Sequence, residues 1–202
     1  MTTVHLVRHG QTNWNLERRI QGQTDSFLTE LGIQQAQKIA SELKNIPFSR
    51  AYSSSSIRAR DTANQILEHH QVPLQLDDQL REIQLGEWEG QLYADIEKTH
   101  PEPHQHFWGD PSLFQFPGAE TFFELQQRAL SSFKKIVSDN PNETILLVSH
   151  GIFIKSILTH VEGRNLQDFW RPPKMENCCH SIIEVSNDRE FLIKKYANLE
   201  RW

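Results

Sequence analysis

One short pattern occurs twice in this chain and limits how it can fold. Leu-Val-Arg-His-Gly at residues 6–10 and Leu-Val-Ser-His-Gly at residues 147–151 each place an aliphatic run before a His-Gly pair. Such runs are typical of buried strands. In an open α/β sheet, ligands bind beyond the carboxyl ends of the strands. The pattern therefore predicts two strands that carry His9 and His150 to one crevice, with glycines such as Gly151 permitting close backbone approach to the ligand.

The rest of the chain alternates strand-like and helix-like segments. Strands are predicted at 4–7, 51–53, 74–76, 144–149, 182–185 and 191–193, and helices from 29 to the proline at 47, through 59–67, from about 120 to 138 and through 154–161. Residues 80–118 are the least regular part. This alternation predicts an α/β fold with a mostly parallel central sheet. The length, without a linker or repeat, fits a single domain over residues 1–202.

Charge and composition argue against several classes of protein. A net charge of -5 disfavours general nucleic-acid binding, which needs a basic face. No apolar run is long enough to span a membrane, and the first residues lack the pattern of a signal peptide. Cys178 and Cys179 are adjacent, which suits neither a disulfide framework nor a metal site, so we expect reduced thiols. These features predict a cytoplasmic protein and leave its oligomeric state open.

Two arginines and an acidic segment lie near the predicted strand ends. Arg8 directly precedes the first histidine of the repeated pattern, and Arg58 lies where a strand turns into a helix. The free N–H groups of a helix N-terminus, together with the planar fork of an arginine, suit a phosphoryl group. A surface ion pair is the simpler alternative for Arg58. One of Glu82, Glu87 and Glu89, which follow the third strand, could donate a proton to a leaving alkoxide.

Together these residues resemble the histidine phosphatase superfamily, the phosphoglycerate mutase-like group. The resemblance extends over nearly the whole chain and rests on Arg8-His9-Gly10-Gln11-Thr12 with Trp14-Asn15, Gln21-Gly22, Ser-x-x-x-Arg58-Ala-x-x-Thr62, Arg81-Glu82 and Ser149-His150-Gly151. It implies a three-layer α/β/α sandwich. It also implies a phosphoric monoester hydrolase of broad specificity that acts on small phosphate esters through a phosphohistidine, with neither metal nor cofactor.

The resemblance assigns a role to each matching residue. His9 matches the nucleophile and Glu82 the proton donor. The groups that hold the phosphoryl oxygens match Arg8, Arg58 and His150, and the lining of the phosphate pocket matches Asn15, Gln21 and Gly22. Neutral His9 can attack phosphorus through one ring nitrogen when a hydrogen bond to the other sets its tautomer. We expect a protonated His150 and a raised pKa at Glu82, whose site is partly desolvated.

Mutases and phosphatases of this family differ in how firmly they retain the leaving group. Phosphoglycerate mutases carry Glu-Arg-His-Tyr-Gly where this chain has Glu-Ile-Gln-Leu-Gly at 82–86, followed by an insertion with a lysine and paired arginines. Between residues 90 and 118, Lys98 is the only basic side chain besides histidines. We therefore expect a phosphatase, with a mutase as the alternative. A phospho-ligand-binding protein without turnover is disfavoured because His9 and Glu82 are both present.

Residues 91–118 correspond to a stretch that tends to form a lid over the phosphate site in this family. Aromatic side chains between 104 and 116 would favour apolar or aromatic leaving groups, or they only pack the lid onto the core. His100, His104 and His106 are an alternative metal site, but no acid or cysteine at ligand spacing supports it. The sequence does not choose among sugar phosphates, phosphoglycerate, phosphoserine, nucleotides and a ribazole phosphate.

Overall fold

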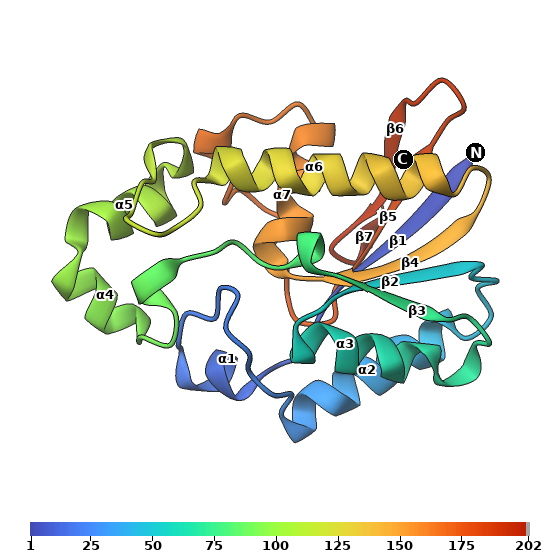
Figure 1. Cartoon of the computed structure of the whole chain (residues 1–202), viewed down its shortest axis with the longest axis horizontal. Helices are drawn as coiled ribbons and strands as arrows, with labels where there is room; N and C mark the ends of the chain where they lie inside the picture. The colour runs from blue at the N-terminus through green and yellow to red at the C-terminus, as the bar shows by residue number, and fades with distance from the viewer. Residues whose placement is uncertain (201–202) are drawn as a thin grey trace.

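The computed structural model describes residues 1–200, and within this range seven strands form one sheet in the order β3-β2-β4-β1-β5-β6-β7 (Figure 1). The strands are β1 (Thr2–Arg8), β2 (Arg50–Ser54), β3 (Leu74–Asp77), β4 (Thr144–Ser149), β5 (His180–Val185), β6 (Phe191–Tyr196) and β7 (Leu199–Glu200). The first four run parallel to one another, and β5, β6 and β7 join antiparallel. The mostly parallel core of the sheet is as predicted.

Helices cover both faces of the sheet. The described helices are α1 (Asn13–Glu17), α2 (Glu30–Leu43), α3 (Ile57–Ile66), α4 (Tyr93–Thr99), α5 (Pro101–Gly109), α6 (Phe122–Asp139) and α7 (Gly151–Val161), with 3-10 turns at Leu67–His69, Asp78–Leu80, Gly86–Trp88, Pro111–Leu113 and Leu166–Asp168. α6 and α7 lie on one face, and α2 and α3 lie on the other (Figure 1). The three-layer α/β/α sandwich is therefore confirmed. None of the helices within residues 1–200 is long and apolar enough to cross a membrane.

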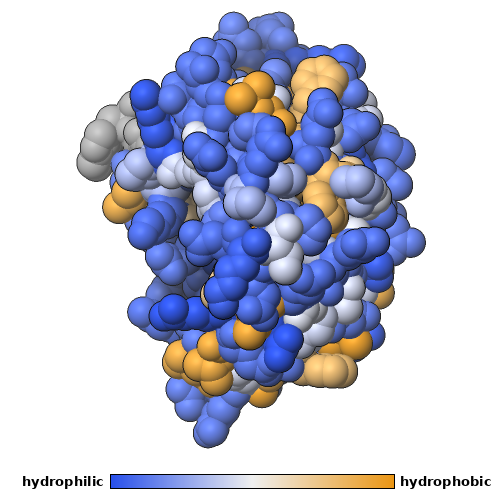
Figure 2. Space-filling model, turned by 90° about the vertical axis from the view of Figure 1, so that its left-hand side faces the viewer, coloured by the Kyte–Doolittle hydropathy of each residue, from blue (hydrophilic) through white to orange (hydrophobic). Residues whose placement is uncertain are grey.

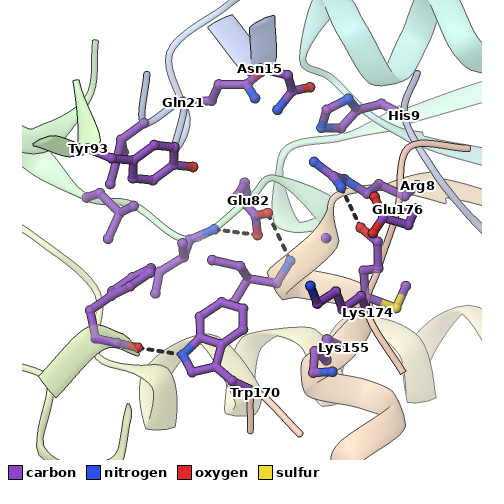
Figure 3. A pocket seen from close by; sticks show the side chains of 18 of the residues that line it. Arg8, His9, Asn15, Gln21, Glu82, Tyr93, Lys155, Trp170, Lys174 and Glu176 are labelled. Atoms are coloured by element: carbon purple, nitrogen blue, oxygen red, sulfur yellow. Dashed lines mark hydrogen bonds between the residues drawn. The ribbon is translucent and has the colours of Figure 1, made fainter. Parts of the chain in front are cut away.

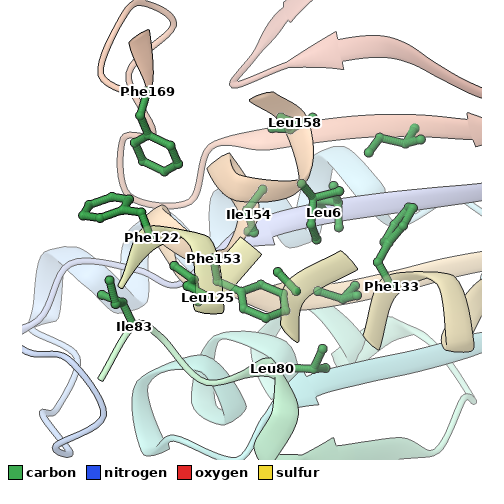
Figure 4. Packing of buried hydrophobic residues seen from close by; sticks show 14 of the residues in the cluster. Leu6, Leu80, Ile83, Phe122, Leu125, Phe133, Phe153, Ile154, Leu158 and Phe169 are labelled. Atoms are coloured by element: carbon green, nitrogen blue, oxygen red, sulfur yellow. The ribbon is translucent and has the colours of Figure 1, made fainter. Parts of the chain in front are cut away.

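The central strands β1 and β4 are buried on both faces, which explains their continuous aliphatic sequences. Val4 and Leu6 belong to the hydrophobic cluster beneath α6 and α7, whereas Val7 belongs to the cluster beneath α2 and α3. Successive side chains of a strand point to opposite faces, so a strand covered on both sides needs apolar residues throughout. Figure 4 shows Leu6 close to Ile154 of α7 within the first of these clusters.

Two helices begin where side-chain caps predict. The Thr29 hydroxyl oxygen accepts a hydrogen bond from the backbone N–H of Gly32 at 3.0 Å, which caps α2. Thr121 and Glu124 form a reciprocal capping box at the start of α6. The predicted starts are therefore accurate to within two residues. The end of α2 is less so, because the helix stops at Leu43, before the proline that was expected to terminate it.

The irregular segment 80–118 contains two helices, α4 and α5, that periodicity did not reveal. Both are short, and α5 begins with a proline in its first turn. Aromatic packing stabilises the region: the buried Trp88 ring lies 5.9 Å from Phe107, 5.4 Å from Phe114 and 5.0 Å from Phe116. Figure 2 shows the side of the molecule that carries α4 and α5, where hydrophobic surface is divided into small separate groups.

Candidate active site

The two histidines of the repeated motif meet at one edge of the sheet. β1 and β4 are parallel neighbours in register, with Arg8 opposite Ser149. The next residue along each strand is therefore His9 or His150, and their ring centroids are 5.3 Å apart. The backbone N–H of His9 donates to the carbonyl oxygen of Ser149 at 3.0 Å, which extends the strand pairing to the site. The structure brings both imidazoles together, as the repeated motif predicts.

A cavity of about 460 Å³ opens at this edge, and all the predicted site residues except His150 line it (Figure 3). They are Arg8, His9, Asn15, Gln21, Gly22, Arg58, Glu82 and Gly151. His150 is fully buried and packs against the ring of His9. These residues come from the end of β1, the loop and short helix after it, the segment after β3 and the first turns of α3 and α7, and they converge on a single space.

The ring of His9 is held in one tautomer. Its Nδ1 lies 2.8 Å from the carbonyl oxygen of Gly10, and a carbonyl can only accept, so Nδ1 carries the proton. Burial and the guanidinium groups of Arg58 and Arg8 lower the pKa of His9 well below its ordinary value of 6.5. The ring is therefore neutral near pH 7, and its other nitrogen, Nε2, keeps a free lone pair.

Three buried nitrogens beside His9 lack a hydrogen-bond partner within residues 1–200. They are Nε of Arg8, Nε of Arg58 and Nδ1 of His150. The other two nitrogens of the Arg58 guanidinium are occupied, because they donate to the carbonyl oxygens of Thr24 at 2.8 Å and Gly22 at 2.6 Å. Buried polar groups are rarely left unpaired in folded proteins, and both arginine nitrogens are donors, so their grouping indicates a ligand with acceptor oxygens.

The surroundings of His150 disfavour its imidazolium form. Burial and the nearby charges of Arg58 and Arg8 lower the pKa of His150 well below 6.5, which favours the neutral ring. Its Nε2 lies 2.8 Å from the hydroxyl oxygen of Ser54, which orients the ring. The expectation of a protonated His150 concerns the site with a phosphoryl group bound and stays a prediction, because a phosphate dianion would oppose the two arginines and raise the pKa of the ring.

Glu82 is the acidic residue that reaches the cavity. Its carboxylate accepts hydrogen bonds from the backbone N–H groups of Ile83 at 3.0 Å, Ile152 at 3.0 Å and Phe153 at 2.9 Å (Figure 3). The last two belong to the first turn of α7, so the carboxylate caps this helix. Burial raises the pKa of Glu82, opposed by these hydrogen bonds and by Arg58. The direction agrees with the expectation.

Neither of the other two candidate carboxylates, Glu87 and Glu89, is placed to act as the proton donor. Glu89 accepts hydrogen bonds from the backbone N–H groups of Gln23 at 3.1 Å, Thr24 at 2.9 Å and Leu85 at 2.9 Å, so it holds the loop that carries Gly22. Glu87 is exposed and does not line the cavity. The structure thus agrees with the resemblance in selecting Glu82 from three acids that composition and spacing alone left open.

Asn15 and Gln21 present their amides in defined orientations. The Oδ1 of Asn15 accepts from the backbone N–H of Thr12 at 3.1 Å, and the Oε1 of Gln21 accepts from the hydroxyl groups of Thr12 at 2.9 Å and Ser26 at 2.6 Å. Because these donors converge on the oxygen atoms, the amide orientation of each residue is determined. The NH₂ group of each side chain remains as a donor for an anion in the cavity.

The glycines near the site allow close packing of neighbouring parts of the protein. A Cβ on Gly10 would lie 2.5 Å from the carbonyl oxygen of Gly32, so this residue allows α2 to pack against the loop after β1. A Cβ on Gly151 would lie 3.3 Å from Nε of Arg8. Gly22 has a φ of +51° and no room for a Cβ beside Glu89. Gly10 does not line the cavity, and the space beside its Cα is filled by α2.

A segment that the sequence analysis missed forms one wall of the cavity. Trp170, Lys174, Met175 and Glu176 lie between α7 and β5 and line the space together with Lys155 of α7. The segment has no periodic pattern. The signal that could have found it is topological: β5 runs antiparallel to β1, so the residues preceding β5 lie at the edge where β1 ends.

The aromatic side chains of residues 104–116 divide between the two roles that the sequence left open. Phe107 and Trp108 line the cavity, whereas Phe114 and Phe116 pack against Trp88 away from it. The Nε1–H of Trp170 donates to the carbonyl oxygen of Phe107 at 2.6 Å, which joins α5 to the missed segment. His100, of the alternative metal site, packs against Phe116. No three His, Cys, Asp or Glu side chains among residues 1–200 are grouped as a metal site requires.

Comparisons with known proteins agree with this geometry. Residues 4–198 match the family model of the histidine phosphatase superfamily, branch 1. The solved structure of YhfR from Bacillus stearothermophilus has a TM-score of 0.96 and 37% identity, and the match covers 99% of this chain and 98% of that one. The metal-independent phosphoserine phosphatase of Arabidopsis thaliana is 32% identical over 203 residues, covering 98% of this chain and 82% of the relative.

Mutase-like proteins are also among the relatives. Phosphoglycerate mutase-like protein 4 of Arabidopsis thaliana is 36% identical over 155 residues, covering 75% of this chain and 67% of the relative. The match to the family model spans most of the chain and includes the residues that converge on the cavity. The chain therefore belongs to the histidine phosphatase superfamily.

Proposed function

We propose that this protein hydrolyses small phosphate monoesters without a metal ion and that His9 carries the phosphoryl group between two steps. The observation that carries the proposal is the set of three buried, unpartnered nitrogens of Arg8, Arg58 and His150 beside a neutral His9. A tetrahedral dianion supplies acceptor oxygens for the two arginine Nε–H groups, and for Nδ1 of His150 when that nitrogen carries a proton. Phosphoryl transfer depends mainly on positioning and on stabilising charge at the equatorial oxygens, and this arrangement provides both.

In the first step, His9 attacks the ester. The lone pair of Nε2 forms a bond to phosphorus while the bond between phosphorus and the ester oxygen breaks. The Nδ1–H remains bonded to the carbonyl oxygen of Gly10, which disperses the positive charge that develops on the ring. The protonated carboxyl group of Glu82 gives its proton to the departing alkoxide, and its raised pKa favours that protonated form.

In the second step, water releases the phosphate. The carboxylate of Glu82, which has just lost its proton, accepts one from a water molecule. The water oxygen forms a bond to phosphorus as the bond to Nε2 of His9 breaks. Inorganic phosphate leaves, and both His9 and Glu82 return to their starting protonation states. One acid and one nucleophile therefore complete the cycle without a further cofactor.

Residues 91–118 fit the expected role of a lid over the leaving group. Within this stretch, Tyr93, Phe107 and Trp108 line the cavity, and Tyr93 lies on the opposite side from Arg8 (Figure 3). A largely aromatic wall favours apolar and aromatic alcohols through burial and ring stacking. Broad specificity is consistent with such a wall, because stacking requires less of the ligand than a set of directed hydrogen bonds.

Two further expectations remain part of the proposal. The free, buried thiols of Cys178 and Cys179 support a cytoplasmic location, where thiols stay reduced. The small-molecule partner is a phosphate ester. The Arabidopsis relative acts on phosphoserine according to its name, so phosphoserine belongs in the first panel of substrates.

The decisive experiment measures phosphate release from p-nitrophenyl phosphate, phosphoserine and 3-phosphoglycerate with excess chelator present. The wild type should hydrolyse at least one ester, and His9→Ala should lose activity by at least about 10⁴-fold, as removal of a covalent nucleophile typically does. Intact-mass measurement after alkaline quenching should detect the phosphorylated wild type but no phosphorylated His9→Ala. His160→Ala, which replaces an exposed histidine of α7, is the matched control and should behave as wild type.

The same panel separates the alternatives. Near-normal hydrolysis by His9→Ala would contradict the phosphohistidine. Isomerisation of 3-phosphoglycerate that depends on added bisphosphate, with little free phosphate, would instead identify a mutase. Binding of inorganic phosphate with no turnover of any ester would identify a phospho-ligand-binding protein.

A further inference from the structure

The segment Trp170–Asn177, which we call the strap, supports the phosphate end of the cavity through several contacts. The carbonyl oxygen of Met175 accepts a hydrogen bond from Nη1 of Arg8. The side-chain Nδ2 of Asn177 lies 3.2 Å from the carbonyl oxygen of His9 and 3.2 Å from Oδ1 of Asn15, so it donates to both. A displacement of the strap would therefore move three groups that face the phosphate.

The strap is held from below by a buried lysine. Lys155 lies in the middle of α7 with 3% of its surface exposed. Its Nζ donates to the carbonyl oxygens of Arg171 at 2.9 Å and Pro173 at 2.6 Å. Prolines have no N–H, so Pro172 and Pro173 cannot supply backbone donors to fasten the strap. An ammonium group, with three donors and no acceptor, is suited to bind converging carbonyls.

A second cation binds the strap from the outside. Arg164 donates to the carbonyl oxygens of Arg171 at 3.0 Å and Pro172 at 3.3 Å, and it does not line the cavity. Two cations thus hold three successive carbonyls of one irregular segment. A buried charge is costly compared with an apolar residue of similar size, so its presence indicates a requirement other than packing.

We propose that Lys155 is a positioning residue: it acts on the phosphate site through the strap, which places Met175 against Arg8 and Asn177 against His9. The proposal rests on the proposed function of the cavity as a phosphate site. Lys155 also lines the cavity, so the competing explanation is a direct contact with the leaving group of the substrate. The two explanations differ in which ligands they affect.

The first experiment compares Lys155→Met with the wild type. The affinity for inorganic phosphate is measured by calorimetry, and kcat and KM are measured with p-nitrophenyl phosphate and phosphoserine. Positioning through the strap predicts that phosphate affinity and kcat/KM for both esters all fall by a similar factor, about 10-fold, because the shared phosphate site is disturbed. Lys134→Met, at an exposed position of α6, is the matched control and should change none of these values.

A loss restricted to phosphoserine, with unchanged affinity for inorganic phosphate, would overturn the proposal in favour of direct contact. Phosphate binding is scored separately from turnover. If the wild type binds phosphate but hydrolyses no ester, the proposed function fails, while the affinity comparison still tests the role of Lys155.

A double-mutant cycle tests the route of the effect. Asn177→Ala removes the contact between the strap and His9. If Lys155 acts through the strap, the double variant Lys155→Met/Asn177→Ala should lose clearly less than the product of the two single losses. If the loss in the double variant equals the product of the two single losses, the two residues act independently and the proposal is contradicted.

Arg164→Met provides a test that does not depend on the folding of a variant with a changed core. This side chain lies outside the cavity and can reach the ligand only through the strap. Its removal should weaken binding of inorganic phosphate about twofold to threefold, and by the same factor for both esters, since Lys155 still holds two of the carbonyls. Unchanged phosphate affinity in this variant would contradict the proposal.

Discussion

The two ends of the cavity are built on different principles. The phosphate end consists of residues that follow strands of the sheet, such as His9 and His150, and its polar atoms are buried and directed by hydrogen bonds. The leaving-group end consists of aromatic side chains from the lid and the strap, including Trp108, whose exposed fraction is 40%. The groups that contact the phosphate thus come from the sheet edge, with backing from the strap, whereas the aromatic side chains that face the leaving group come from segments added around the sheet.

The largest effect should come from removing a cation at the phosphate end. In Arg58→Met, kcat/KM should fall by about 10³-fold, the loss expected when a preorganised donor to the transition state is removed. The fall should be similar for p-nitrophenyl phosphate and phosphoserine, because both place the same group at this end. Arg60→Met, two residues along and half-exposed, is the control and should leave the kinetics unchanged. A loss confined to one ester would show that Arg58 contacts the leaving group, which would contradict the distinction between the two ends of the cavity.

A smaller and more selective effect is expected for Glu82→Gln, which removes the proton donor between the two ends. Hydrolysis of phosphoserine should fall by about 10²-fold, because its alkoxide must be protonated as it leaves. Release of p-nitrophenolate needs little protonation, so the first step with that ester should be much less affected. The exposed Glu87→Gln is the control.

The pH dependence of phosphoserine hydrolysis gives a second test of Glu82 as the proton donor. Because burial raises the pKa of Glu82, the wild type should keep the acid form to higher pH than an ordinary carboxyl group does. The rate of the first step with phosphoserine should fall as pH rises through that pKa. This fall in rate at higher pH should be absent in Glu82→Gln. If it persists, another group donates the proton.

Stability at acidic pH should also distinguish the phosphate end from the rest of the molecule. Burial lowers the pKa of His9 and His150 below 6.5, and lowers those of His5 to about 4 and His180 to about 3. The unfolded chain therefore binds more protons at these four histidines, so the stability that their neutral forms contribute is fully present above about pH 6.5 and is lost as pH falls below it. Each histidine contributes at most about 1.4 kcal/mol per pH unit.

Denaturant unfolding at pH 7.5 and 5.5, with and without sulfate, measures this loss. Sulfate should restore part of the stability at pH 5.5, because an anion favours protonated His9 and His150, but not the part due to His5 and His180, which do not line the cavity. The extra restoration at pH 5.5 should disappear in Arg58→Met. Equal gains at both pH values would show that the anion does not bind beside the histidines.

The smallest effect belongs to the leaving-group end. Trp108→Ala should reduce kcat/KM for aryl phosphates about threefold to fivefold, in line with the loss of one aromatic contact, and should leave phosphoserine nearly unchanged. The variant should fold, because this ring is partly exposed. Phe123→Ala, at an exposed aromatic position on α6, is the control. An equal loss for both esters would mean that the aromatic wall only supports the phosphate end.

The difference between the two ends also explains which parts of the site the sequence could predict. His9, Arg58 and Glu82 each follow or begin a regular element, and strand ends of a parallel sheet share one edge. The lid helices α4 and α5 and the strap have no such regular pattern. Aromatic packing around Trp88 and the hydrogen bonds of Lys155 hold them in place, and such long-range contacts leave no local periodicity.

The state of His150 was equally inaccessible from its neighbours in the chain. The sequence indicates a histidine at a strand end, but its pKa depends on full burial and on Arg58, which is distant in the chain. The resemblance selected Glu82 over Glu89, but the physical reason for that choice lies in the fold. The carboxylate of Glu89 accepts a hydrogen bond from the backbone N–H of Gln23, 66 residues away in the chain, and only the folded chain shows this contact.

The sequence by itself determined the α/β class, the two strands that end in histidine and the residues of the phosphate end. Those features follow from hydrophobic periodicity and from motifs within a few residues, and both are local properties of the chain. Only the tertiary structure decided the tautomer of His9, the neutral state of His150 and the anchoring of the strap by Lys155. Each of these depends on hydrogen bonds and charges between residues far apart in the chain, and these form only when the sheet edge, α7 and the strap come together.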